Sequence, residues 1–100
     1  MIVPFQVKPS SKVLIAGCGG GFDVLAAGFP VGRYLERQGH TVFYSSYTFT
    51  HLSKIENAET MERFPHQVRV IGHNSTGPKY FPEKYLCEWY AGKNDPRIPI

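Results

Sequence analysis

The residues best suited to chemistry lie in a glycine-rich segment near the N-terminus. Residues 12–23 read KVLIAGCGGGFD, a short apolar run followed by a loop that ends in a carboxylate. A strand, a glycine-rich turn and a helix N-terminus in this order are typical of an anion-binding or cofactor-binding corner. Consecutive glycines also let a ligand approach the backbone closely. The segment therefore predicts a site for a small polar or nucleotide-type ligand, with Gly17, Gly19, Gly20, Gly21 and Asp23 as binding residues.

The loop departs from the known nucleotide fingerprints. Phe22 stands where the third glycine of GxGxxG belongs, and the next predicted strand ends in Ser45-Ser46 without the acidic residue that would bind the ribose. No Gly-Lys-Ser/Thr follows the glycines, which excludes a P-loop. NAD and NADP in their usual pose are disfavoured and the cofactor stays unknown, while Ser45 is predicted to contact the ligand.

Asp23 has two interpretations. It is a good N-cap for the helix that follows. It would also serve as a carboxylate that binds an amine, a sugar hydroxyl or a phosphate-bound metal, because a bare phosphate would be repelled there. The two cysteines, Cys18 and Cys87, lack metal-site spacing, so no metal site is predicted. Cys18 lies near a helix N-terminus, where a thiol can become reactive.

Two histidines follow predicted strands. With Asp23, His51 and His73 are the candidates for general acid–base catalysis, although the sequence leaves open whether the chain is an enzyme. His73 opens the segment HNSTG, in which Asn74 and Ser75 are predicted ligand contacts. Small polar residues beside a glycine suit a binding loop and an ordinary turn equally well.

The elements that would position these groups alternate along the chain. An extended lead-in over residues 1–11 precedes predicted strands at 12–16, 41–46 and 67–72 and predicted helices at 23–38, 55–64 and 82–91. Pro30 should kink or split the first helix near Gly28. The order β-α-β-α-β-α predicts a three-layer Rossmann-like parallel sheet in a single α/β domain, residues 1–100. The segment 97–100 resembles the start of a fourth strand, so we expect the N-terminal part of a larger doubly wound domain.

Such a sheet would bring three loops together at the carboxyl ends of its strands, residues 17–23, 45–51 and 73–79. The third predicted helix carries Phe81, Tyr85 and Trp89, which would serve the core or a subunit interface. The 100 residues are 42% hydrophobic and carry a net charge of +3 without a basic run, so nucleic acid is not an expected partner. No signal peptide or apolar run of about 20 residues occurs, which predicts a cytoplasmic protein without a membrane partner. A second copy, or the remainder of a longer chain, stays open as a partner.

The sequence resembles two families. The GxGGGxD loop, the Gly39-His40 helix end and the segments Tyr47–Thr50 and Tyr80–Glu83 resemble an uncharacterised Rossmann-like family catalogued as a domain of unknown function. That resemblance implies a doubly wound fold two to three times as long as this chain, and no established activity.

The strand, the glycine loop and residues 37–42, RQGHTV, are similar to the N-terminal, acceptor-binding domain of two-domain glycosyltransferases. Phe22-Asp23 stands where those enzymes carry a loop histidine. Three hypotheses follow: a ligand-binding Rossmann-like domain, the acceptor-binding half of a glycosyltransferase, or a non-catalytic binding or assembly module that uses the aromatic helix.

Overall fold

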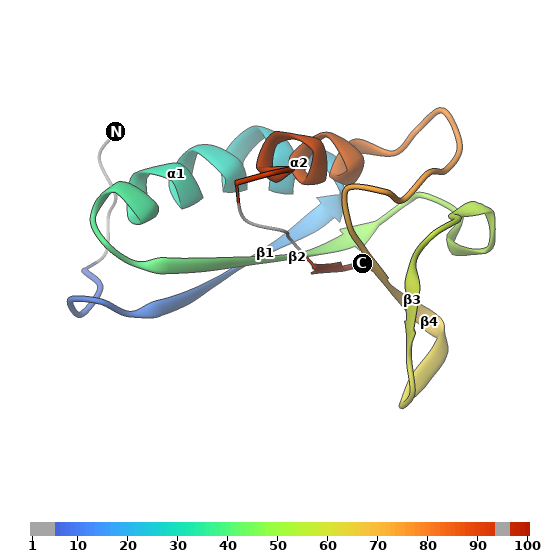
Figure 1. Ribbon diagram of the computed structural model, residues 1–100, viewed down its shortest axis with the longest axis horizontal. Helices are drawn as coiled ribbons and strands as arrows, with labels where there is room; N and C mark the ends of the chain where they lie inside the picture. The colour runs from blue at the N-terminus through green and yellow to red at the C-terminus, as the bar shows by residue number, and fades with distance from the viewer. Residues whose placement is uncertain (1–5, 94–96) are drawn as a thin grey trace.

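Two separate β-sheets and two α-helices form the structure, a computed structural model that describes residues 6–93 and 97–100 (Figure 1). A two-stranded sheet pairs β1 with β2, and a three-stranded sheet has the order β3-β4-β5. The elements in chain order are β1 (Lys12–Gly20), the π-helical segment η1 (Val24–Gly28), α1 (Phe29–Arg37), β2 (Thr41–Thr48), the 3-10 turn η2 (Leu52–Lys54), β3 (Glu59–Met61), β4 (Phe64–Ile71), α2 (Pro82–Tyr90) and β5 (Ile98–Pro99).

The first half of the chain is a parallel β-α-β unit. β1 and β2 pair in parallel from Lys12↔Thr41 to Gly17↔Ser46, and η1 and α1 make the crossover between them. The crossover helices η1 and α1 lie on one side of this sheet (Figure 1). The opposite face is open, because the cross-strand pair Leu14 and Phe43 is 63% and 51% exposed.

The predicted first helix is confirmed, and it is not split at Gly28 but changes there from π-helical to α-helical hydrogen bonding. The π-helical turns of η1 end at Gly28 and α1 begins at Phe29, with Pro30 in its first turn. The N–H of Phe29 donates to Val24 O, so η1 continues into α1, and the wider π-helical turn before Pro30 accommodates a residue that has no N–H to donate. Gly39, with φ +91, follows the helix end and reverses the chain into β2.

The predicted three-layer parallel sheet is wrong. Residues 55–64 do not form a helix: they contain β3, a turn and the first residue of β4. β4 is not a third parallel strand, because it pairs antiparallel with β3 through Glu59↔Val70 and with β5 through Ile71↔Ile98. Residues 59–71 pair as a local hairpin, which prevails over the helix that the weak helical spacing of the apolar residues suggested. Pro65 is tolerated near the start of β4.

The remaining predicted elements have mixed outcomes. The third helix is confirmed as α2, with Pro82 in its first turn and Gly92 at φ +77 beyond its end. The fourth strand expected at residues 97–100 exists as β5, although it runs antiparallel to β4. In the lead-in, residues 6–11 form no strand or helix, and residues 1–5 lie outside the described part of the chain.

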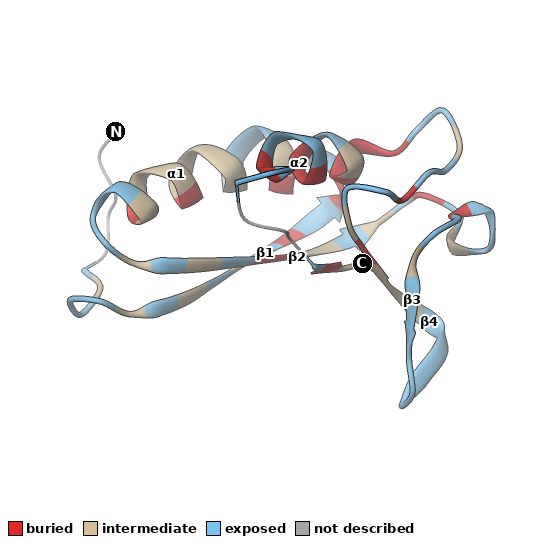
Figure 2. Ribbon diagram, in the orientation of Figure 1, coloured by how far each residue is buried: buried red, intermediate tan, exposed pale blue. Residues whose placement is uncertain are grey.

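The core lies where α2 packs against η1 and where β5 packs against β2. Its members are Val24, Tyr44, Ile55, Ile71, Phe81, Leu86, Cys87, Tyr90, Ile98 and Ile100. Figure 2 shows the buried positions on α2 and on the strand ends beside it, whereas the β3–β4 hairpin is mostly exposed. Of the three aromatic residues predicted for a core or an interface, Phe81 is buried, while Tyr85 and Trp89 are 62% and 46% exposed. Within residues 6–93 and 97–100, no helix is long and apolar enough to cross a bilayer.

Candidate functional site

The glycine loop folds around its own carboxylate. The backbone N–H of Cys18 donates a hydrogen bond to Asp23 Oδ2 at 2.9 Å. A Cβ on Gly19 would lie 2.8 Å from Asp23 Cγ, and a Cβ on Gly17 would lie 2.7 Å from Val24 Cβ. These two glycines therefore let the end of β1 approach the start of η1. Asp23 precedes η1 but caps it with no side-chain hydrogen bond, so its carboxylate binds the loop instead of the helix.

The next two glycines contact residues from distant parts of the chain. Gly20 and Gly21 have φ +80 and +103, a backbone conformation that favours glycine. A Cβ on Gly20 would strike the ring of Phe49, and one on Gly21 would lie 2.5 Å from Glu83 Oε2. The loop is fixed further by Phe49 N, which donates to Gly20 O at 3.2 Å, and by the Tyr80 hydroxyl, which donates to the same oxygen at 3.3 Å.

Glu83 is a fully buried carboxylate beside the loop. It lies in the first turn of α2, is 0% exposed and accepts a hydrogen bond from Ser46 Oγ at 2.8 Å. Its other oxygen, Oε1, is buried without a hydrogen-bond partner, as is Asp23 Oδ1. Buried carboxylate oxygens are costly unless a donor or a cation faces them. Both carboxylates adjoin the glycine loop, and each keeps one unused acceptor inside the protein.

Negative charge at this position also affects a neighbouring thiol. Cys87 lies one turn after Glu83 in α2 and is completely buried. Burial, followed by the charges of Glu83 and Glu88, raises the pKa of Cys87 to about 12. Cys18, in contrast, is exposed beside the loop.

A groove crosses the carboxyl ends of β1 and β2. It has a volume of about 460 Å³ and faces residues of β4 and the C-terminal segment. We call it the β1–β2 groove. Its walls include Ala16, Gly17, Cys18, Ser45, Ser46, Tyr47, Thr48, Thr50, Leu52, Gln67, Val68, Pro99 and Ile100. Gly17 and Ser45, both predicted ligand contacts, therefore line the same groove, and Ser46 connects it to Glu83 through the hydrogen bond described above.

The third predicted loop belongs to a different pocket. His73 and Asn74 line a polar cavity of about 490 Å³ together with Asn57, Gly72 and Arg97. Ser75 is buried, and its hydroxyl accepts from Gly72 N at 3.0 Å and donates to Asn57 O at 2.7 Å, so it holds the loop rather than facing a cavity.

The candidate catalytic residues are distributed accordingly. Asp23 lies at the glycine loop and His73 at the polar cavity, while His51 is exposed at the start of η2 and lines neither of these two cavities. The structure thus brings together the glycine loop and Ser45 but separates them from His73, Asn74 and Ser75.

Sequence reasoning missed Glu83 as a part of the glycine-loop site. Its place after Pro82 indicates only a helix N-terminus, where an acidic residue is favourable in any case. Its burial depends on the packing of α2 against the loop, which no local pattern encodes. A second tertiary feature is a hydrogen-bonded chain in the core: Tyr90 donates to Glu36 Oε1 at 2.6 Å, and its hydroxyl lies 2.9 Å from that of Tyr44. Burial is the largest cause that raises the pKa of both tyrosines.

Comparison with protein-family models, curated proteins and solved structures found no match to this chain, so neither family resemblance gains support beyond the residues that suggested it.

Proposed function

We propose that this chain binds a small organic ligand in the β1–β2 groove, and that the ligand presents an amine or a hydroxyl group to the glycine loop. The groove volume of about 460 Å³ falls within the range of about 300–1,000 Å³ that is usual for small-molecule sites. It also lies at the carboxyl ends of parallel strands, where ligands commonly bind in α/β folds.

The walls of the groove suit a ligand with an apolar body and a few polar groups. Ala16, Leu52 and Val68 supply apolar surface and Ser45 supplies a hydroxyl, whereas the hydroxyl of Ser46 is bonded to Glu83. Binding sites of this kind gain affinity from apolar contact, while a small number of polar groups fix the orientation of the ligand.

The carboxylates beside the groove are the observation that carries the proposal, although neither Asp23 nor Glu83 is among its lining residues. Asp23 already accepts the N–H of Cys18, and Glu83 lies against Gly21. Each retains a buried oxygen without a partner. Two carboxylates so close to the groove would repel an anion and attract an ammonium group, and they would tolerate a neutral hydroxyl group. A phosphate-bearing ligand is accordingly disfavoured.

A thermal-shift screen of the whole chain tests this function, with primary amines, sugars and nucleotides as the probe classes. A ligand at 100 times its Kd adds about 2.7 kcal/mol to the free energy of unfolding. Ala16→Leu would fill the groove and should abolish the shift. Ala27→Leu is the matched control, because Ala27 is exposed on η1 and does not line the groove. A shift that survives Ala16→Leu would place the ligand elsewhere.

The chemical class is tested by Asp23→Asn. Its amide oxygen can still accept the bond from Cys18, but the negative charge is lost. We expect this variant to lose affinity for amines and to retain affinity for sugars. A wild-type chain that prefers nucleotides, and does so in the groove by the Ala16→Leu criterion, would contradict the choice of amine or hydroxyl.

A further inference from the structure

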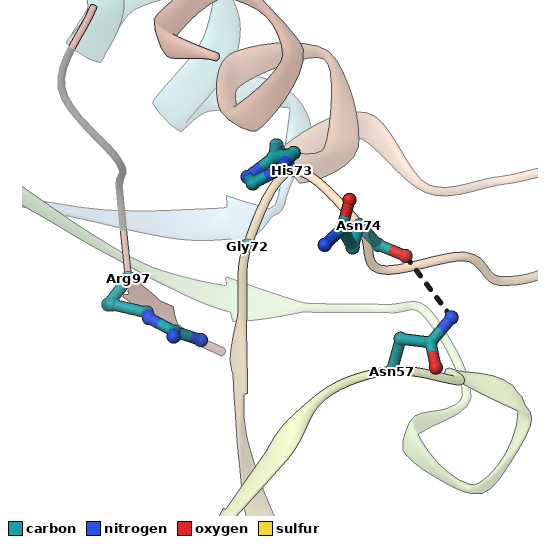
Figure 3. A pocket seen from close by; sticks show the side chains of 5 residues that line it. All are labelled: Asn57, Gly72, His73, Asn74 and Arg97. Atoms are coloured by element: carbon teal, nitrogen blue, oxygen red, sulfur yellow. Dashed lines mark hydrogen bonds between the residues drawn. The ribbon is translucent and has the colours of Figure 1, made fainter. Parts of the chain in front are cut away.

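The polar cavity is separate from the β1–β2 groove and is built from three segments of the chain. Asn57 precedes β3, His73 and Asn74 follow β4, and Arg97 precedes β5 (Figure 3). We call this cavity of about 490 Å³ the Arg97 pocket. In the described part of the chain its lining residues are Asn57, Gly72, His73, Asn74 and Arg97, and the groove shares none of them.

Hydrogen bonds hold the wall of the Arg97 pocket in place. Glu56 and Thr76 exchange both backbone hydrogen bonds, at 2.7 and 3.0 Å. Ser75 Oγ donates to Asn57 O, and Asn57 Nδ2 donates to Asn74 O at 3.3 Å (Figure 3). Asn57 has φ +57, a conformation that asparagine tolerates better than most residues. The segments on either side of the pocket are therefore fixed to each other before any ligand binds.

The pocket combines a guanidinium, which only donates hydrogen bonds, with asparagine amides, which donate and accept. The guanidinium of Arg97 carries five N–H groups in a planar fork that matches a carboxylate or a phosphate. The side-chain amide of Asn74 adds N–H donors, and among residues 6–93 and 97–100 no acidic side chain lines the pocket. His73 also lines the pocket.

One carboxylate outside the lining competes for Arg97. Glu59 Oε1 lies 2.7 Å from Arg97 Nη1, and both side chains are about 60% exposed, at 63% and 60%. An exposed pair of this kind contributes little free energy, so a ligand that engages the guanidinium in the pocket can displace it or use its remaining N–H groups.

We propose that the Arg97 pocket binds a small oxyanion, the carboxylate or phosphate group of a ligand, through the guanidinium of Arg97 and the amide of Asn74. The guanidinium of Arg97 supplies the positive charge and a bidentate pair of N–H groups, and the amide of Asn74 donates a further hydrogen bond to the same oxyanion from another side. Glu59 acts as a weak internal competitor for the same guanidinium.

Titrations of the isotopically labelled whole chain with inorganic phosphate and with acetate, followed by amide NMR at constant ionic strength, test the site. We expect saturable shifts at residues 72–75 and at Arg97. Saturation by both anions assigns a general oxyanion site, and saturation by one of them identifies the preferred group. Shifts that are absent, or that an equal concentration of chloride reproduces, would overturn the proposal.

Three substitutions make the test specific. Arg97→Gln should weaken binding at least tenfold, whereas Glu59→Gln should strengthen it up to about fivefold, because loss of the competing pair frees less than about 1 kcal/mol. Arg63→Gln, in the exposed turn between β3 and β4, removes the same charge elsewhere and should leave the affinity unchanged. Asn74→Asp places a negative charge in the exposed pocket wall and should also weaken binding, which keeps the proposal testable if Arg97→Gln fails to fold. Equal effects of Arg63→Gln and Arg97→Gln would show non-specific attraction and refute it.

Discussion

Substitution of Gly21 by alanine tests whether Glu83 packs against the glycine loop. Gly21 has φ +103, and a Cβ there would lie 2.5 Å from Glu83 Oε2. Gly39 is a matched control, because it has a similar φ of +91 and nothing lies within 4 Å of its Cβ position. Both variants incur the cost of a positive φ, but only Gly21→Ala should also displace a buried carboxylate.

The two costs can be estimated from the structure. A non-glycine residue at positive φ costs about 1–2 kcal/mol, which applies to both variants. Displacement of Glu83 also breaks its 2.8 Å hydrogen bond with Ser46, and a hydrogen bond to a charged group contributes about 1.5–3 kcal/mol. We therefore expect Gly21→Ala to lower the free energy of unfolding by about 2.5–5 kcal/mol and Gly39→Ala by about 1–2 kcal/mol.

Urea denaturation of the two variants measures this difference, and a double-mutant cycle assigns it. In a Glu83→Ala background the alanine methyl at position 21 has room, so Gly21→Ala should cost no more than Gly39→Ala. Coupling energies between residues in contact are about 0.5–3 kcal/mol. Equal losses in the two single variants, or an unchanged cost in the Glu83→Ala background, would refute the packing of Glu83 against the loop.

Three further predictions concern the core and the open sheet face. A thiol reagent should label exposed Cys18 in the native protein and label Cys87 only after unfolding. Folding raises the pKa of Cys87 from 9.0 to about 12, so the stability that its protonated thiol contributes is complete below pH 9 and is lost as the pH rises towards 12. Cys87→Ala should therefore flatten the fall in the free energy of unfolding over that pH range. Tyr90→Phe removes the donor to Glu36 and should cost about 1.5–3 kcal/mol in urea unfolding, against less than about 0.5 kcal/mol for Tyr85→Phe on the exposed side of α2. Phe43→Thr should cost less than about 1 kcal/mol by thermal unfolding, because the ring is half exposed on the uncovered face, and a larger loss would show that this face is covered in solution.

The elements with strong local signals could be predicted from the sequence. A continuous apolar run before glycines indicates β1, and α2 follows from Pro82 and Gly92 at its two ends. The segment 55–64 could not be assigned correctly, because its apolar residues are few and its strand pairing depends on β4. Whether β4 pairs in parallel or antiparallel depends on which strands lie beside it, and its own sequence does not show those partners. The β-α-β alternation alone predicted a parallel strand.

The candidate site was predictable only where the residues are close in sequence. Gly17 to Asp23 form one loop, and Ser45 lies near it because β1 and β2 pair in register, Ala16↔Ser45. Glu83 joins this site from α2, 60 residues after Asp23 in the numbering, and Arg97 joins His73 through the pairing of β5 with β4. Contacts of that range depend on packing that a single sequence does not display.

The change in sheet topology also explains why the predicted crevice separates into two chemically opposite sites. Three parallel strands would have placed their carboxyl ends along one edge, with Asp23 and His73 around a single ligand. Because β4 belongs to the antiparallel sheet, its following loop opens onto the Arg97 pocket instead. The glycine loop retains two carboxylates with unpartnered oxygens, whereas a guanidinium and two amides line the Arg97 pocket, with no acid among the lining residues that the structure describes. A ligand or group suited to one site is thus unsuited to the other, so Asp23→Asn should leave oxyanion binding unchanged and Arg97→Gln should leave amine or hydroxyl binding unchanged.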